Sequence, residues 1–111
     1  MEGPFYKDSK MQKIFNCYSD PGHGWVKVKR IDLVRLGLMK KISNCSYERK
    51  GHVYLEEDCD WPIFSEQLKK MTGISPKVNV FNTDRESKIR NYRYFELDLI
   101  DESAIKVIGA K

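Results

Sequence analysis

The alternation of apolar and polar positions is clearest in the middle of the chain. Val53 and Leu55 alternate with more polar neighbours, and this period of two predicts a half-buried strand. Large apolar residues then recur at steps of three and four, the spacing of one helix face: Trp61, Phe64, Leu68 and Met71. Pro62 falls in the first turn, where helices accept proline. We therefore expect a helix over residues 59–72.

The same strand period occurs in other parts of the chain. These segments are residues 11–18, 25–30, 45–49, 77–81 and 95–99. In the second of them, WVKVKR, valines alternate with lysines, so that strand has one basic face in contact with solvent. The predicted fold class is α+β: a mainly antiparallel sheet of five or six strands, with one principal helix on one face and one or two short helices.

Two short helices are also predicted. The first covers residues 31–38, with Ile31, Val34 and Leu38 facing inward and Gly37 placed where a left-handed residue ends a helix. The second begins at Thr83 and Glu86, which have the spacing of a capping box, and runs to about Tyr92.

Length and composition limit the domain organisation. The chain has 111 residues, of which 41% are hydrophobic, enough for one core. We predict a single domain over residues 1–111, with a flexible lead-in at 1–10 and a loose tail at 101–111. No apolar run approaches the roughly 20 residues that cross a bilayer. The three cysteines lack paired spacing and no apolar signal segment begins the chain, so we predict a cytoplasmic protein without a membrane partner.

An acidic cluster lies between the central strand and the principal helix. It consists of Glu56, Glu57, Asp58 and Asp60. One interpretation is capping, because carboxylates near the first turn of a helix are stabilised by its unpaired amides. The other is a negatively charged contact surface for a host protein with a basic surface, because four carboxylates within five positions repel one another more than capping requires. Trp61 would anchor that surface, and His23 and Trp25 are further candidates for it.

A catalytic or metal-binding role is the third possibility. His23 stands between two glycines, and an imidazole held on such a loop with Asp20 or Glu57 is typical of a general base. The alternative is an exposed loop residue on a glycine turn. A metal cluster would have to combine residues without close pairs, namely Cys17, His23, Cys45, His52 and Cys59. The acidic cluster lacks the spacing of a calcium loop, so we expect no metal and no cofactor.

A basic and aromatic segment follows at residues 85–95. The net charge of the chain is +4, and this segment contains four nucleic-acid-binding candidates: Lys88, Arg90, Tyr92 and Arg93. Cations beside aromatic rings suit phosphate contact with base stacking. They suit the solvated face of a basic helix equally well.

Four segments resemble a family of small, mostly hypothetical proteins that phages and plasmids encode. They are SDPGHGWVKVKR, the short helix ending in LGL, KISNCSYERKG and HVYLEEDCD, and the later FNTDRESKIRNY is similar to some members. The resemblance covers about residues 14–95, and DPGHGW and YLEEDCD are its most specific motifs. It implies an origin in a mobile element, where small proteins often act on host machinery, including immunity. The resemblance assigns no catalytic residue to this chain.

These observations leave three functional hypotheses. The first is a non-enzymatic accessory protein that binds and inhibits a host complex, either a defence complex of the anti-CRISPR or anti-restriction type or a nucleic-acid-handling machine. The second is a nucleic-acid-binding module that uses residues 85–95. The third is a small hydrolase or metal-dependent enzyme that uses His23. The pattern does not specify an oligomeric state.

Overall fold

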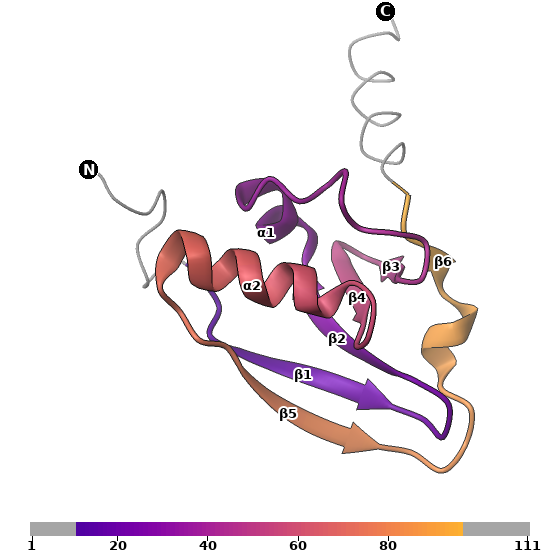
Figure 1. Ribbon diagram of the computed structural model, residues 1–111. Coiled ribbons are helices and arrows are strands. Elements are labelled where there is room, and N and C mark those ends of the chain that lie inside the picture. The colour runs from indigo at the N-terminus through magenta and orange to yellow at the C-terminus, as the bar shows by residue number, and fades with distance from the viewer. Residues whose placement is uncertain (1–10, 97–111) are drawn as a thin grey trace, which may run out of the picture.

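A six-stranded mixed sheet with one main helix organises this protein (Figure 1). The computed structural model describes residues 11–96. The predicted lead-in, the tail and the end of the predicted last strand lie outside these described residues. The strands are β1 (Ile14–Ser19), β2 (Gly24–Lys29), β3 (Tyr47–Arg49), β4 (His52–Glu56), β5 (Lys77–Asn82) and β6 (Arg93–Tyr94). The helices are α1 (Arg30–Arg35), α2 (Trp61–Thr72) and the 3₁₀ turn η2 (Lys88–Asn91).

The order of strands across the sheet is β5-β1-β2-β4-β3-β6. Every neighbouring pair is antiparallel except β1 and β5, which run parallel. The connection from β4 to β5 contains α2. The predicted α+β class and the mostly antiparallel sheet are therefore confirmed. None of the helices within residues 11–96 is long and apolar enough to cross a membrane.

The main core lies between one face of the sheet and α2. Phe15 meets Phe64 edge to face at 5.5 Å between ring centroids, and Val26, Leu55 and Leu68 are fully buried around them. Burying several large apolar side chains at roughly 1.5–3 kcal/mol each is the main stabilising contribution of this layer. The helix ends at Gly73, whose φ of 78° is a left-handed conformation that glycine adopts without steric cost.

The predicted inward face of α1 is wrong for Ile31 and Val34, whereas the burial predicted for Leu38 is confirmed. Ile31 and Val34 are about half exposed, whereas Asp32 and Leu33 are buried. The helix has only six residues, so the turn after it supplies most of the apolar contact through Leu36 and Leu38. Gly37 in that turn has a φ of 70°, as predicted.

The helix predicted over residues 83–92 is reduced to the 3₁₀ turn η2. The hydroxyl of Ser87 accepts the bond from the Ile89 amide at 3.1 Å and begins this turn. Thr83 instead accepts from the amide of Arg85, so the predicted capping box does not start a helix. The short segment follows the sheet surface because Ile89 is buried against it.

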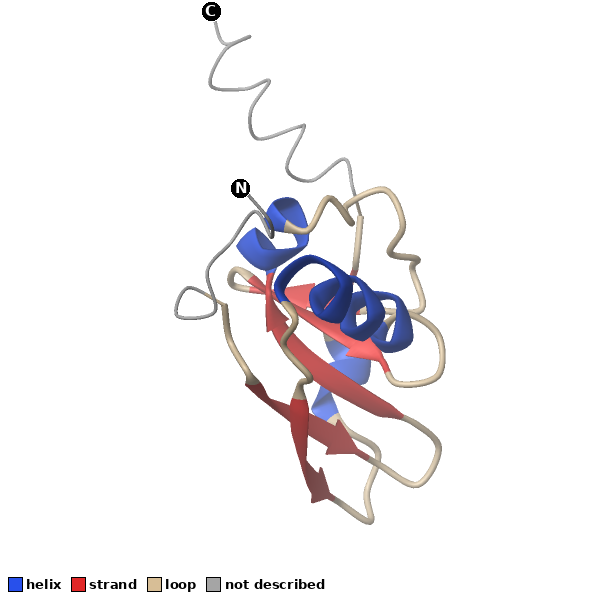
Figure 2. Ribbon diagram, turned by 60° about the vertical axis from the view of Figure 1, so that its left-hand side comes forward, coloured by secondary structure: helices blue, strands red, loops and turns tan. Residues whose placement is uncertain are grey.

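The second face of the sheet carries an aromatic cluster. Its buried members are Trp25, Tyr54 and Ile89, with Tyr18, Tyr47 and Tyr92 packed around them. Figure 2 shows α1 and α2 on one side of the sheet and η2 on the other. Because η2 is short, it covers only part of this face, which we call the open face.

Candidate functional site

The acidic cluster does not form one exposed surface. Glu56 is only 8% exposed, and its Oε2 lies 3.1 Å from Nδ1 of His23. Its Oε1 accepts a hydrogen bond from the amide of Asp58 at 2.8 Å. Asp60 is 1% exposed, and its Oδ2 accepts bonds from the amide and hydroxyl of Ser43 and from the hydroxyl of Ser46. These two carboxylates join segments of the fold and leave Glu57 and Asp58 as the exposed members.

The two tryptophans predicted to contact a partner, Trp25 and Trp61, pack against other side chains of the protein instead. Trp25 is 2% exposed, so it offers almost no surface to a partner. Trp61 is half-buried and packs on Phe15 and Phe64 at 5.3 and 5.6 Å between ring centroids. Capping by side chains, the other interpretation of the cluster, is absent at the start of α2, because the Asp60 side chain makes no cap bond there. Of the residues predicted to bind a partner, only Glu57, Asp58 and His23 are therefore exposed.

His23 has a carboxylate partner, although a different one from those predicted. The Glu56 carboxylate lies within hydrogen-bonding distance of its ring, whereas Asp20 accepts only its backbone amide at 2.9 Å. Half of the His23 side chain is exposed, and the ring lies 5.9 Å from that of Trp25. The hollows described below are lined by other residues. An enzymatic role for His23 stays a prediction.

Within residues 11–96, no three His, Cys, Asp or Glu side chains come together in a group that could hold a metal ion. Cys17 is buried, whereas Cys45 and Cys59 are exposed. Among the described residues, the five members of the possible metal set therefore do not come together in one group.

The predicted nucleic-acid residues divide into two groups. Arg90 donates from Nε and Nη2 to both carboxylate oxygens of Asp20, at 2.7 and 3.0 Å, and its guanidinium lies 5.1 Å from the centre of the Trp25 ring. It therefore holds η2 on the sheet. Lys88 and Arg93 are exposed. The half-buried Tyr92 ring lies 5.3 Å from the guanidinium carbon of Arg49.

The open face adds cations that the sequence hypothesis for residues 85–95 did not include. One hollow of about 310 Å³ lies between η2 and the sheet and is lined by Tyr18, Lys27, Arg49, Tyr54, Ser87, Lys88, Ile89 and Tyr92. A second of about 300 Å³ is lined by Gln12, Asn16, Lys27, Lys29 and His52. Lys27 lines both, so the two hollows adjoin, and we call them together the basic strip. Among residues 11–96, four side chains with fixed positive charge line it, and no carboxylate does.

The sheet register explains why these cations gather. Lys29 pairs with His52, which pairs with Arg49 on the next strand. Paired residues project to the same face, and adjacent strands lie about 4.8 Å apart. The alternation in WVKVKR signalled a basic face on β2. Its continuation through Arg49 and Lys88 depends on pairing between distant segments.

The basic strip changes the acid–base properties of His52. Burial lowers the pKa of this histidine below its ordinary value of 6.5, and the charge of Lys27 lowers it further. Lys29 acts in the same direction, while a hydrogen bond with the backbone of Lys50 opposes it. Next door, burial raises the pKa of the Tyr54 hydroxyl, so this group stays neutral. A negative charge placed over the strip would favour the protonated form of His52.

An aromatic pair lies at one end of the open face. Tyr18 on β1 stacks on Phe81 of the parallel neighbour β5, with centroids 5.7 Å apart and ring planes 21° apart. Phe81 is 52% exposed although it is a large apolar side chain. The pair presents a stacking surface next to Lys27, because Tyr18 lines the same hollow as that lysine.

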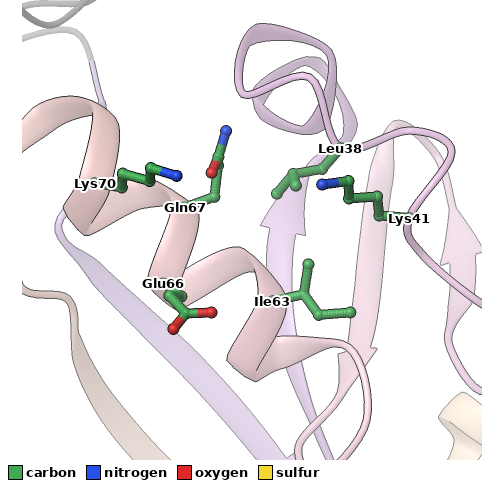
Figure 3. Close-up of a pocket in the computed structure, with 6 residues that line it drawn as sticks. All are labelled: Leu38, Lys41, Ile63, Glu66, Gln67 and Lys70. Atoms are coloured by element: carbon green, nitrogen blue, oxygen red, sulfur yellow. The ribbon is translucent and has the colours of Figure 1, made fainter.

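A hollow of about 470 Å³ lies on the other side of the sheet, between α2 and the segment after α1 (Figure 3). Lys41 and Lys70 line it together with Glu66, so its charges are of mixed sign. The Gln67 amide donates to the carbonyl of Leu36 at 3.1 Å, which joins the two walls. Because its charges are of mixed sign and a hydrogen bond joins its walls, we treat this hollow as a gap between two packed elements. The basic strip is the better candidate site.

No protein family, characterised protein or solved structure matches this chain. The resemblance to phage- and plasmid-encoded proteins and the mobile-element origin that it implies therefore stay predictions.

Proposed function

We propose that this protein binds single-stranded nucleic acid across the open face of its sheet. The observation that carries the proposal is the basic strip: Lys27, Lys29, Arg49 and Lys88 line two adjoining hollows, and no carboxylate of the described residues lines them. Phosphate contacts by such cations supply most of the affinity of a protein for nucleic acid. The net charge of +4 acts in the same direction and steers a polyanion toward the protein.

The aromatic residues favour a single strand over a duplex. Tyr18 and Phe81 at one end and Tyr92 at the other can each stack on an unpaired base, and stacking contributes about 1–3 kcal/mol per base. A base within a duplex is already stacked on its neighbours. Within the described part of the chain, this face is formed mainly by strands and a 3₁₀ turn of four residues, and these present no long helix to a major groove.

Binding should weaken steeply as salt is added. If four cations each contact one phosphate, the logarithm of the association constant should fall against the logarithm of salt concentration with a slope of about −3, from roughly −0.7 per contact on a single strand. Fluorescence anisotropy of labelled single-stranded DNA and RNA, titrated at several salt concentrations, measures this slope. The absence of binding at the lowest salt would exclude the proposed function, and tighter binding to the matched duplex would exclude the single-strand assignment.

Binding should also become tighter as the pH falls. A phosphate over the strip opposes the effect of Lys27 and raises the pKa of His52, so the complex takes up a proton and affinity rises between about pH 7.5 and 5.5 by a factor of roughly 3 to 10. The variant His52→Gln should lose this dependence. His23 is the only other histidine in the chain, so His23→Gln is the matched control and should keep it. If the pH dependence is lost in His23→Gln and kept in His52→Gln, then His23 takes up the proton, and the prediction for His52 is wrong.

Inhibition of a host protein complex stays a prediction. Of the acidic residues predicted to contact the host protein, only Glu57 and Asp58 are exposed. They lie outside the residues that line the basic strip, so the two functions can be tested separately. A double variant at these two positions should leave nucleic-acid affinity almost unchanged if the strip is the binding site.

A further inference from the structure

Cys45 and Cys59 lie next to each other in the fold although 14 positions separate them in the sequence. The two thiols lie close enough for the Cys45 side chain to raise the pKa of Cys59, and both residues contact the hydroxyl of Ser43. Both side chains are exposed, whereas Cys17 is buried. The pair connects the loop before β3 with the turn before α2, so the two cysteines flank the β3–β4 hairpin.

The surroundings hold the two thiols in place. The Ser43 hydroxyl lies 3.6 Å from the sulfur of Cys59 and accepts a bond from the backbone amide of Cys45 at 3.1 Å. Ser43 is fixed in turn, because its amide and hydroxyl both donate to Oδ2 of the buried Asp60. Ser46 donates to the same oxygen at 2.6 Å. The two loops are therefore tied to one carboxylate, and the thiols approach each other on a supported site.

Two neighbouring thiols can also bind a metal ion. Structural zinc sites need four ligands from cysteine, histidine or carboxylate side chains. Within the described part of the chain, no third ligand completes a group around these two. The geometry therefore fits a bond between the two sulfurs better than a shared ion.

We propose that Cys45 and Cys59 form a reversible disulfide through exchange with a low-molecular-weight disulfide of the glutathione type. One thiol loses its proton, and the thiolate attacks the small disulfide and releases one glutathione thiolate. The second thiol loses its proton, and its thiolate attacks the mixed disulfide and displaces the second glutathione. Two protein thiols are thereby oxidised, and one small disulfide is reduced to two thiols.

The charge of the site controls the rate of this exchange. The Ser43 hydroxyl lowers the pKa of Cys59, but the Cys45 thiol, burial and the Asp60 charge together raise it above the ordinary value of 9.0. Because the thiolate is the attacking species, the bond should form slowly at neutral pH and faster in mildly alkaline solution.

The test treats the full chain with oxidised glutathione in mildly alkaline solution and analyses it by mass spectrometry. We expect a monomer about 2 Da lighter than the reduced protein, because two hydrogen atoms are removed. A peptide that links Cys45 to Cys59 should appear after proteolysis, and reductant should reverse both changes. Restriction of the unfolded chain should also raise Tm by about 5 °C or more.

Three variants make the test specific. Cys45→Ser and Cys59→Ser should accumulate only the mixed disulfide with glutathione, whereas Cys17→Ser should still form the internal bond. The linked peptide of the unmodified protein requires no variant, so the result does not depend on how the variants fold. Mixed disulfides at both positions, a link to Cys17, or disulfide-linked dimers as the main product would each overturn the proposal.

Discussion

Replacing Lys27 and Lys88 together with glutamate is expected to weaken the binding of a single-stranded oligonucleotide by about 100-fold or more. The two side chains line the same hollow from opposite walls, Lys27 on β2 and Lys88 on η2. Each substitution removes one phosphate contact and adds a repulsive charge, and the salt slope should fall in magnitude by roughly 1.4. Anisotropy titrations at one low salt concentration measure the loss.

A matched control separates the basic strip from the net charge. Lys69 and Lys70 are exposed in the last turn of α2, on the other side of the sheet. Changing both to glutamate lowers the net charge from +4 by four, to zero, as the pair in the strip does. Affinity should then fall by only a few-fold. Equal losses in the two variants would show that binding follows total charge and would contradict the assignment to the open face.

The elements that the sequence predicted well are those with a long local pattern. Val53 and Leu55 in β4 and Phe64 and Leu68 in the apolar stripe of α2 are buried, and Trp61 and Met71 of the same stripe are partly buried against the core, because a period of two or 3.6 over several residues determines which side faces a core. The pattern is too short in α1, where six residues cannot specify a face by periodicity. Tertiary contacts there bury Leu33 and expose Ile31.

The candidate site depends on pairings that no local pattern contains. Adjacency in the sequence suggests either helix capping or one acidic surface for Glu56 to Asp60, yet Glu56 and Asp60 contact residues 33 and 17 positions away. The basic strip arises in the opposite way, because residues far apart in sequence become neighbours. The lysines of β2 signalled one part of it, but the register that adds Arg49 to them is a property of the whole sheet.

The largest effect on stability is expected from Asp20→Asn. The Asp20 side chain is 1% exposed and accepts five hydrogen bonds. Its Oδ2 accepts from Nε of Arg90 and from the amide of Ser87, and its Oδ1 accepts from Nη2 of the same arginine and from the amides of Gly22 and His23. An asparagine would place an amide donor against two or more of these donors. We expect a loss of about 3 kcal/mol in the free energy of unfolding.

The pH dependence of stability provides an independent test of this carboxylate. The Arg90 side chain, followed by the amides of Ser87, His23 and Gly22, lowers the pKa of Asp20 well below its usual range against the opposing effect of burial. As the pH falls past the ordinary value of 3.8, the unfolded chain binds a proton that the folded chain does not, so the folded protein loses stability. Asp20→Asn should lack this contribution.

Chemical denaturation between about pH 3 and pH 7 compares the variant with the unmodified protein, and Asp84→Asn, at an exposed aspartate, is the control. The difference in unfolding free energy between the Asp20 variant and the unmodified protein should shrink on acidification, whereas the control should stay within about 0.5 kcal/mol of the unmodified protein. Because Asp20 joins the β1–β2 turn to η2 through Arg90, its loss should also release Lys88 from the edge of the basic strip. A variant as stable as the unmodified protein would contradict the role of this ion pair in holding η2 on the sheet.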